Sequence, residues 1–297
     1  MIYTVTLNPA LDYVLKLDKL DFEDINRADR AKLYFGGKGI NVSKVLCELE
    51  SENIALGFAG GFTGEKLESL LSAESIKTDF VHINGDTRIN VKIRYQKELD
   101  INVSGPEISE SEINELIDKL DKAKQGDYVV FAGSVSKNLP SDVYERMMKR
   151  CAEGVNFVVD AEGDLLLNSL KYKPFLIKPN HHELAKLFGT EIKSEEDVIT
   201  YAKKLRGMGA KNVLVSLAEN GAVLLDENNT IHRIKNAEGT LINSVGCGDS
   251  MVAGFISGYI KTGDYAYSLK LATACANATA YSEGLASREQ IEKLIKG

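Results

Sequence analysis

The sequence predicts an α/β fold in which a mostly parallel central sheet is covered by helices on both faces. From Ser109 onward, short β-branched runs alternate with amphipathic helical segments, as in strands linked by crossover helices. Polar residues follow the carboxyl ends of several strands, where open α/β sheets bind ligands. The glycine-rich segment Asn243–Ser250 leads into the apolar run Met251–Tyr259, which has helical spacing.

Composition restricts the class of protein. The chain has 297 residues, of which 44% are hydrophobic and 27% charged, and this length suits one large domain or two small ones. The net charge of −7 disfavours non-specific binding to nucleic acid or acidic membranes. Four scattered cysteines without a C-x-x-C pair indicate a reducing compartment rather than disulfides or zinc. We find no signal peptide and no apolar run near the ~20 residues of a membrane helix, so we expect a cytoplasmic protein.

The N-terminal segments predict two strands and a helix. Ile2–Leu7 is a strand that stops at Asn8-Pro9, and Leu11–Leu17 alternates as a half-exposed strand does. Asp12, at the start of the second strand, is either a turn residue or a ligand for sugar hydroxyls. Gly36–Val42 then opens an amphipathic helix with a lysine and an asparagine, but it is not a Walker A loop. This glycine-rich start is either a plain capped turn or a ligand-binding edge.

The next segments predict a second, smaller sheet. After a strand at Ile54–Gly61 and a helix at Gly64–Ser72, the residues of Thr87–Tyr95 alternate strictly, and Asp100–Val103 could pair with them as a hairpin. One face of this strand is apolar, and the other carries Arg88, Asn90, Lys92 and Arg94. Such a face is usually solvated, but three cations and an amide could also grip a phosphate.

The remaining segments supply the strands and helices of the α/β alternation. We expect strands at Tyr128–Ala132, Asn156–Val159, Phe175–Ile177, Asn212–Val215, Gly221–Leu225 and Thr230–Arg233. We expect helices at Ser111–Ala123, Ser141–Ala152, His182–Phe188, Glu195–Arg206, Asp249–Lys261, Tyr265–Ser282 and Arg288–Ile295. The polar residues at strand ends are Ser134, Asp160, Lys178, Asn180 and Ser216.

The segment around Asn180 raises the question of a metal. His181 and His182 are adjacent, and adjacent helical residues point about 100° apart, so we interpret both as surface residues rather than chelators. Asn180 and Glu183 are three residues apart and share a helix face. Oxygen ligands of this kind suit a hydrated Mg²⁺.

The segment Asn243–Ser250 carries the strongest chemical signal. Gly246 and Gly248 permit a sharp turn and bring bare N–H groups close to a ligand, while Asp249 lies where the turn becomes a helix. Helix N-termini bind phosphates, so a carboxylate there would lie beside a bound phosphoryl group as a base. On this motif alone, Asp249 or Ser250 is as well explained as a helix N-cap.

Together these segments resemble the phosphofructokinase B group of the ribokinase-like sugar kinases, and the resemblance spans the whole chain. Within that group, Thr87–Lys92 and Lys178–Leu184 are most similar to the bacterial 1-phosphofructokinases. The segments that carry the resemblance, in the family's order and spacing, are Asn8–Asp12, Gly36–Asn41, Thr87–Lys92, Gly133-Ser134, Lys178–Glu183, Val215-Ser216 with Gly221, and Val245–Ser250.

The resemblance implies a ribokinase-like three-layer α/β/α sandwich with a small β lid. It implies a single kinase domain over 1–297, with lid segments near 12–17, 32–36 and 87–104. The implied activity is ATP-dependent phosphorylation of fructose 1-phosphate at its C6 hydroxyl, giving fructose 1,6-bisphosphate. Tagatose-6-phosphate kinase and 6-phosphofructokinase are the alternative enzymes, and a non-catalytic sugar-phosphate sensor is the alternative outside enzymes. The resemblance also allows a homodimer through the lid.

The resemblance further assigns residues to roles. Asp249 would be the base, and the backbone N–H groups of Gly246, Cys247 and Gly248 would form an anion hole. The sugar phosphate would be held by Asp12, Gly37, Lys38, Asn41, Arg88, Asn90 and Ser134. Of these, Arg88, Asn90 and Ser134 would surround its phosphate. ATP would be bound by Lys178, Asn180, Glu183, Ser216, Gly221, Gly248 and Asn277, with Mg²⁺ held by Asn180 and Glu183 through water.

The chain departs from the family pattern in three places. Cys247 replaces the usual alanine or serine of the anion hole, where only the backbone N–H is needed, and we expect the helix N-terminus to raise its reactivity. Ala218 replaces the usual glycine of the nucleotide segment. Asp160–Gly163 lacks the common small hydroxyl residue, and the sequence does not indicate what this changes.

Overall fold

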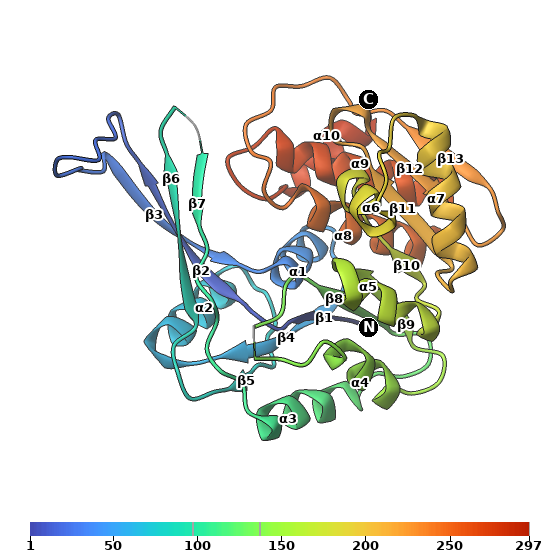
Figure 1. The fold of residues 1–297 in the computed structure, drawn as a ribbon, viewed down its shortest axis with the longest axis horizontal. Helices are drawn as coiled ribbons and strands as arrows, with labels where there is room; N and C mark the ends of the chain where they lie inside the picture. The colour runs from blue at the N-terminus through green and yellow to red at the C-terminus, as the bar shows by residue number, and fades with distance from the viewer. Residues whose placement is uncertain (97, 137, 297) are drawn as a thin grey trace.

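The computed structural model describes residues 1–96, 98–136 and 138–296, so Lys97, inside the predicted lid segment 87–104, lies outside the described residues. It contains a nine-stranded sheet flanked by helices and a separate four-stranded sheet (Figure 1). The order of the large sheet is β13-β12-β11-β10-β9-β8-β1-β4-β5. In that order the strands are Ile231–Ile234, Ala222–Leu225, Asn212–Ser216, Leu176–Ile177, Asn156–Asp160, Tyr128–Ala132, Ile2–Thr6, Asn53–Ala59 and Val81–His82.

The large sheet is parallel from β5 to β11, and only β12 and β13 run antiparallel at one edge. Its central strands are buried along their whole length, as expected when helices cover both faces. The helices are α1 Lys38–Glu48, α2 Gly61–Ala73, α3 Glu110–Leu120, α4 Val143–Arg150, α5 Gly163–Ser169, α6 His181–Phe188, α7 Glu195–Gly207, α8 Cys247–Thr262, α9 Tyr265–Ala280 and α10 Arg288–Lys296.

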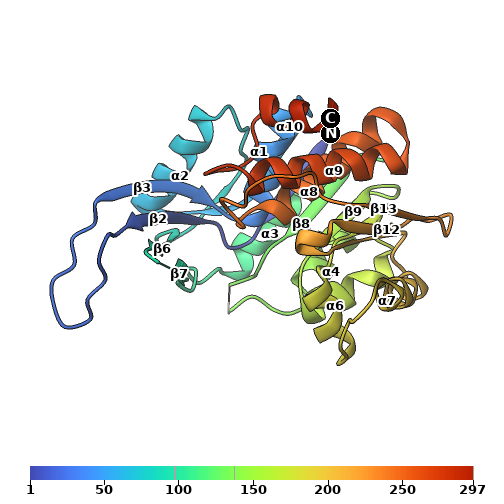
Figure 2. The same cartoon turned by 90° about the horizontal axis from the view of Figure 1, so that it is seen from above.

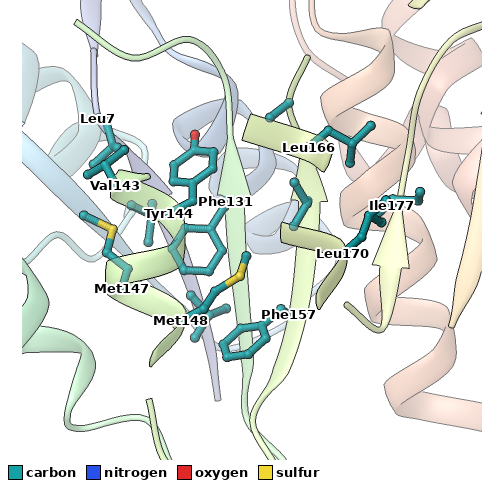
Figure 3. Close-up of a cluster of buried hydrophobic side chains, with 14 of the residues drawn as sticks. Leu7, Phe131, Val143, Tyr144, Met147, Met148, Phe157, Leu166, Leu170 and Ile177 are labelled. Carbon is teal, nitrogen blue, oxygen red and sulfur yellow. The ribbon is translucent and has the colours of Figure 1, made fainter. Parts of the chain in front are cut away.

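Alternate residues of the same strands feed two separate hydrophobic cores. In β8, Val129 and Phe131 pack with α3 to α7, whereas Tyr128 and Val130 pack with α1, α8, α9 and α10. Figure 3 shows part of the first core, where Tyr144 of α4 lies against Phe131, with 5.0 Å between the ring centroids. The two cores on opposite faces make the three-layer α/β/α arrangement, so the predicted fold class is confirmed.

The small sheet, here called the lid, has the order β3-β2-β6-β7 and projects from the large sheet (Figures 1 and 2). Its strands are β2 Ala10–Lys16, β3 Arg30–Gly36, β6 Arg88–Arg94 and β7 Glu98–Ile101. Four links join it to the body: Leu7–Pro9 between β1 and β2, Gly37 between β3 and α1, 83–87 between β5 and β6, and 102–109 between β7 and α3. The base of the lid packs on α2 through Leu11 and Leu67.

Some predicted boundaries differ from the structure. The expected strand Ile54–Gly61 ends at Ala59, and α2 begins at Gly61, whose φ of 62° breaks the extended chain. The short elements α5 and β5 were not predicted. No helix of the described residues is long and apolar enough to cross a membrane.

Candidate active site

A cavity of about 760 Å³ lies at the carboxyl ends of the parallel strands, and its lining includes lid residues. Most of the residues predicted for the site line this cavity. They are Asp12, Gly37, Lys38, Asn41, Arg88, Ser134, Lys178, Asn180, Glu183, Ser216, Gly246, Gly248 and Asp249. Asn90, Gly221, Cys247 and Asn277 do not belong to its lining, although Asn90 and Cys247 lie in β6 and α8, which contribute other residues to it.

Asp249 lies in the first turn of α8 at the inner end of the cavity. Its carboxylate is 4% exposed and accepts a 2.8 Å hydrogen bond at Oδ2 from the side-chain amide of Asn41 in α1. The N-cap of α8 is Gly246, with φ 82°, and no side chain caps it. Ser250 instead donates its hydroxyl to the Gly246 carbonyl. The alternative in which Asp249 or Ser250 is the helix N-cap is therefore wrong.

The environment of Asp249 suits a general base. Burial, aided by the negative charge of Asp160, raises the pKa of Asp249 to about 6. The positive charge of Lys38 and the hydrogen bond from Asn41 oppose this rise. A carboxyl group with a pKa just below neutrality is ionised at pH 7 and still accepts a proton readily.

Two lysines flank a second carboxylate, that of Asp160. Asp160, at the end of β9, lies 3.3 Å from Lys178 Nζ and 3.5 Å from Lys38 Nζ, and it is 2% exposed. Burial alone would raise the pKa of Asp160, but the charges of Lys178 and Lys38 outweigh it and lower that pKa. Burial likewise disfavours the charge of Lys38, but Asp160 and Asp249 raise its pKa overall. The Lys38 ammonium group therefore stays charged.

The glycines at the start of α8 let the Lys178 ammonium group approach the backbone. A Cβ on Gly248 would lie 3.0 Å from Lys178 Nζ, and one on Gly246 would lie 2.4 Å from a methyl carbon of Leu285. Gly246 also has the positive φ that favours glycine. The orphan N–H groups at the start of α8 and the Lys178 ammonium therefore share one region, which suits a phosphoryl group.

The polar face of the lid lies toward the cavity rather than solvent. Asn90 and Lys92 are buried, whereas Ile89, on the apolar face, is exposed. The Asn90 amide donates to Asp12 Oδ1 at 2.8 Å, and Lys92 Nζ lies 3.1 Å from Asp100 and 4.0 Å from Asp12. Of the two interpretations of this strand, a solvated polar face is wrong for Asn90 and Lys92.

Arg88 is the cation of the lid that lines the cavity without a carboxylate partner. It donates from Nη1 to the Val103 carbonyl and from Nη2 to the Asn8 carbonyl, each at 3.0 Å. No ion pair to Arg88 is formed by the residues in ranges 1–96, 98–136 and 138–296. Lys38, Lys92 and Lys178 are all paired, so Arg88 carries the least compensated positive charge in the cavity.

Asn180 and Glu183 form reciprocal hydrogen bonds at the start of α6. Glu183 N–H donates to Asn180 Oδ1, and Asn180 N–H donates to Glu183 Oε2, both at 2.8 Å. This capping box accounts for the two residue types without a metal. Both residues nevertheless line the cavity, and each keeps oxygen lone pairs free for a hydrated cation.

The histidines beside them form no metal site. The rings of His181 and His182 lie 3.9 Å apart, and His182 is exposed. In the part of the chain that the structure describes, no group of three or more His, Cys, Asp or Glu residues could hold a metal ion.

The three departures noted in the sequence have distinct structural outcomes. Burial, with the charge of Asp249, raises the pKa of the Cys247 thiol to about 11, so the expected activation by the helix N-terminus is wrong. Ala218 has a φ of 50°, in the left-handed region that favours glycine. Asp160 bridges the two lysines, which strand-end position alone could not reveal.

A buried carboxylate, a donor-rich helix start and lid residues that line the same cavity are the features expected of a small-molecule kinase, in which water must be kept from phosphoryl transfer. A model of the pfkB family of carbohydrate kinases matches residues 5–291. The 1-phosphofructokinase of Bacillus subtilis is 42% identical over 99% of this chain and 97% of its own. The D-tagatose-1-phosphate kinase of Bacillus licheniformis is 37% identical over the same shares.

A solved structure extends the similarity to three dimensions. Phosphofructokinase-2 from Escherichia coli, crystallised with substrates and products, superimposes with a TM-score of 0.94 at 26% identity. The match covers 99% of this chain and 98% of that one. The chain belongs to the pfkB family of carbohydrate kinases.

Proposed function

We propose that this protein is a 1-phosphofructokinase, which transfers the γ-phosphoryl group of ATP to the C6 hydroxyl of fructose 1-phosphate. The observation that carries the proposal is the buried Asp249 carboxylate, oriented by Asn41 at the start of α8. A full-length relative with this activity is 42% identical. A sensor that only binds would not need a base held in this way.

In the proposed mechanism, Arg88 binds the phosphate that the sugar already carries. The ketose then extends along the cavity toward Asp249, which orients its far primary hydroxyl and removes the proton. The N–H groups of Gly246, Cys247 and Gly248 and the ammonium groups of Lys38 and Lys178 stabilise the negative charge of the transferring group. The lid excludes water, which would otherwise compete as the nucleophile.

The cavity also has the chemistry to receive Mg²⁺ with ATP. The buried Oδ2 of Asp160 forms an ion pair with Lys38 at 3.5 Å but has no hydrogen-bond partner in the described ranges, and Asn180 and Glu183 add further oxygen atoms. Mg²⁺ prefers such oxygens and usually keeps several waters and phosphate oxygens as ligands. We therefore assign Asn180 and Glu183 to bound Mg²⁺ through water, where the ion would neutralise phosphate charge.

The nucleotide is placed on the side of the cavity formed by Lys178, Ser216 and Gly248, which all contribute to its lining. Gly221 and Asn277 do not line the cavity. Gly221 turns the chain before β12, and Asn277 is buried in α9. We propose that these two shape the adenosine site rather than line the reacting end.

The second candidate is a kinase for a tagatose phosphate, which the Bacillus licheniformis relative favours. Steady-state rates on fructose 1-phosphate, fructose 6-phosphate, tagatose 1-phosphate and tagatose 6-phosphate separate the alternatives. We expect the highest kcat/KM on fructose 1-phosphate, with two phosphate monoesters in the product by ³¹P NMR. A higher kcat/KM on a tagatose phosphate, or on fructose 6-phosphate, would transfer the assignment to that sugar.

We also propose a homodimer through the outer face of the lid and a cytoplasmic location. The apolar outer face is more exposed than a monomer needs, with values from 36% to 48% at Ile89, Tyr13, Leu99, Val103 and Ile101. Sedimentation should give a dimer mass that Ile101→Asp converts to a monomer, whereas a monomeric wild type would end this proposal.

The proposed cytoplasmic location has a separate basis. The four free cysteines support a reducing compartment.

A further inference from the structure

One polar side chain of the cavity has no assigned task. Asn8 lies in the link between β1 and β2, is 7% exposed, and lines the cavity. Its Oδ1 is buried and has no hydrogen-bond partner among the residues described. Buried amide groups are nearly always paired, so an unpaired one beside a ligand cavity indicates a role in binding.

The surroundings of Asn8 are rich in hydrogen-bond donors. Its own carbonyl accepts from Arg88 Nη2 at 3.0 Å, which fixes the link against the guanidinium. Ser136 Oγ, 2% exposed, is likewise unpaired. A Cβ on Gly105 would lie 2.2 Å from Asn8 Oδ1 and 2.8 Å from Ser136 Oγ, so glycine at 105 packs closely over both atoms and covers them.

Asn90, by contrast, already has side-chain partners at both ends of its amide. Its Nδ2 donates one hydrogen bond to Asp12, and its Oδ1 accepts from Val103 N–H at 3.2 Å and from Arg88 Nη1 at 3.4 Å. Asn90 does not line the cavity, so these contacts position Asp12 and Arg88.

We propose that Asn8 is a substrate-binding residue whose Nδ2 donates a hydrogen bond to the phosphate of the sugar phosphate, beside Arg88. This inference rests on the proposed function. Because Oδ1 is covered, Nδ2 is the polar side-chain atom left to face the cavity. Phosphate oxygens only accept, and the uncompensated charge of Arg88 attracts them, so the ligand class that fits is a phosphate monoester.

The test compares Asn8→Ala and Asn8→Asp with the wild type. Removing the donor should raise KM for fructose 1-phosphate about 10-fold, and Asn8→Asp should raise it further because a carboxylate repels phosphate. KM for ATP should stay within about twofold, since Lys178 and Gly248 lie on the other side of the site. Inorganic phosphate should compete with the sugar phosphate in the wild type and more weakly in both variants.

Ser136→Ala is the matched control, because it alters the same buried region without touching the cavity. If it raises KM as much as Asn8→Ala does, packing explains the effect and the inference is overturned. Should Asn8→Ala fail to fold, Asn8→Ser and Asn8→Asp replace it. A KM equal in these two would also overturn the inference.

Arg88→Ala, measured in parallel, separates a failure of the inference about Asn8 from a failure of the substrate assignment. If Arg88→Ala raises KM for the sugar phosphate and both Asn8 variants leave it unchanged, only the inference about Asn8 fails. If neither residue affects KM, the phosphate lies elsewhere and the substrate assignment fails as well.

Discussion

The side-chain amide of Asn41 donates a 2.8 Å hydrogen bond to the carboxylate of Asp249. The two residues lie at the starts of α1 and α8, so the two glycine-rich helix starts of the sequence meet at one point. The amide fixes the carboxylate without neutralising it. An asparagine at the start of α1 therefore suits this position, because a neutral amide orients the Asp249 carboxylate without adding a charge beside it.

Asp249→Asn should abolish phosphoryl transfer while preserving the fold and ligand binding. Loss of the base should lower kcat by roughly 10²–10⁴-fold or more. Coupled-assay rates and calorimetric binding of ATP and sugar phosphate would check both parts. Near-normal turnover by the purified variant would remove Asp249 from the role of base.

The same substitution should make the protein more stable at pH 7. The pKa of Asp249 is raised from 3.8 to about 6 on folding, so its ionisation favours the unfolded state. Its contribution is fully present below pH 3.8 and is lost as pH rises through about 6. Removing this charge should raise the free energy of unfolding by on the order of 1–3 kcal/mol at pH 7. Thermal melts at pH 7 and pH 4 should show a smaller gain at the lower pH; an equal gain at both would contradict the shift.

Activity should fall as pH drops through about 6, because only ionised Asp249 accepts the hydroxyl proton. The measurement is kcat/KM between pH 5 and 8 at constant ionic strength, with stability monitored in parallel. A profile that is flat down to pH 5 would show that this carboxyl group does not have the raised pKa or is not the base.

Arg88→Ala should raise KM for fructose 1-phosphate by roughly 10–150-fold and leave KM for ATP nearly unchanged. Arg88→Lys keeps the charge but loses the fork, so it should restore part of the affinity. Lys92→Ala should cost less, because Lys92 already pairs with Asp100. Equal losses on fructose 1-phosphate and unphosphorylated fructose would mean that Arg88 does not recognise the phosphate.

Cys247 should react slowly with iodoacetamide at pH 8, since its pKa is raised to about 11 and few molecules carry the thiolate. Its thiol is directed to the Asn243 carbonyl, 3.6 Å away, and only its backbone N–H serves the anion hole. Cys247→Ala should therefore keep most activity. Peptide mass spectrometry would give the labelling rate, and rapid labelling at neutral pH would rule out a buried thiol.

Ala218→Gly should raise the free energy of unfolding by about 0.5–1 kcal/mol, because Ala218 has a φ of 50°. Ala222→Gly is the control, since Ala222 is buried in β12 with ordinary strand geometry and should lose stability. Denaturant unfolding would measure the change in the free energy of unfolding for each variant. A decrease in both would show that the left-handed conformation of Ala218 carries no strain.

Local patterns predicted most of the fold but few of the contacts in the site. The β-branched runs and the glycine-rich turn before Asp249 are properties of neighbouring residues, so they can be read from the chain. The bridge from Asp160 to Lys38 and Lys178 depends on strand order, which brings Lys38 beside Asp160 although the two are more than a hundred positions apart. Asn180 and Glu183 have the spacing of a capping box, a local signal for the start of α6 that the sequence analysis did not use.

The lid residues show a different limit. Alternation in Thr87–Tyr95 separated a polar from an apolar face, but it could not decide which one faces water. The answer depends on the cavity beneath the sheet, where Asn90 and Lys92 are covered. Short elements such as α5 lack the length that makes a helical period visible.

Because four links join the lid to the body, the residues of the site are divided between two parts of the molecule. Residues assigned to the sugar phosphate, such as Asp12 and Arg88, sit on the lid, whereas Asp160, Lys178 and Asp249 belong to the body. Substitutions in the lid can therefore change which acceptor sugar is bound during evolution, while the residues for phosphoryl transfer in the body stay the same. A protein engineer who wants a new acceptor sugar would start with lid libraries and leave the large sheet alone.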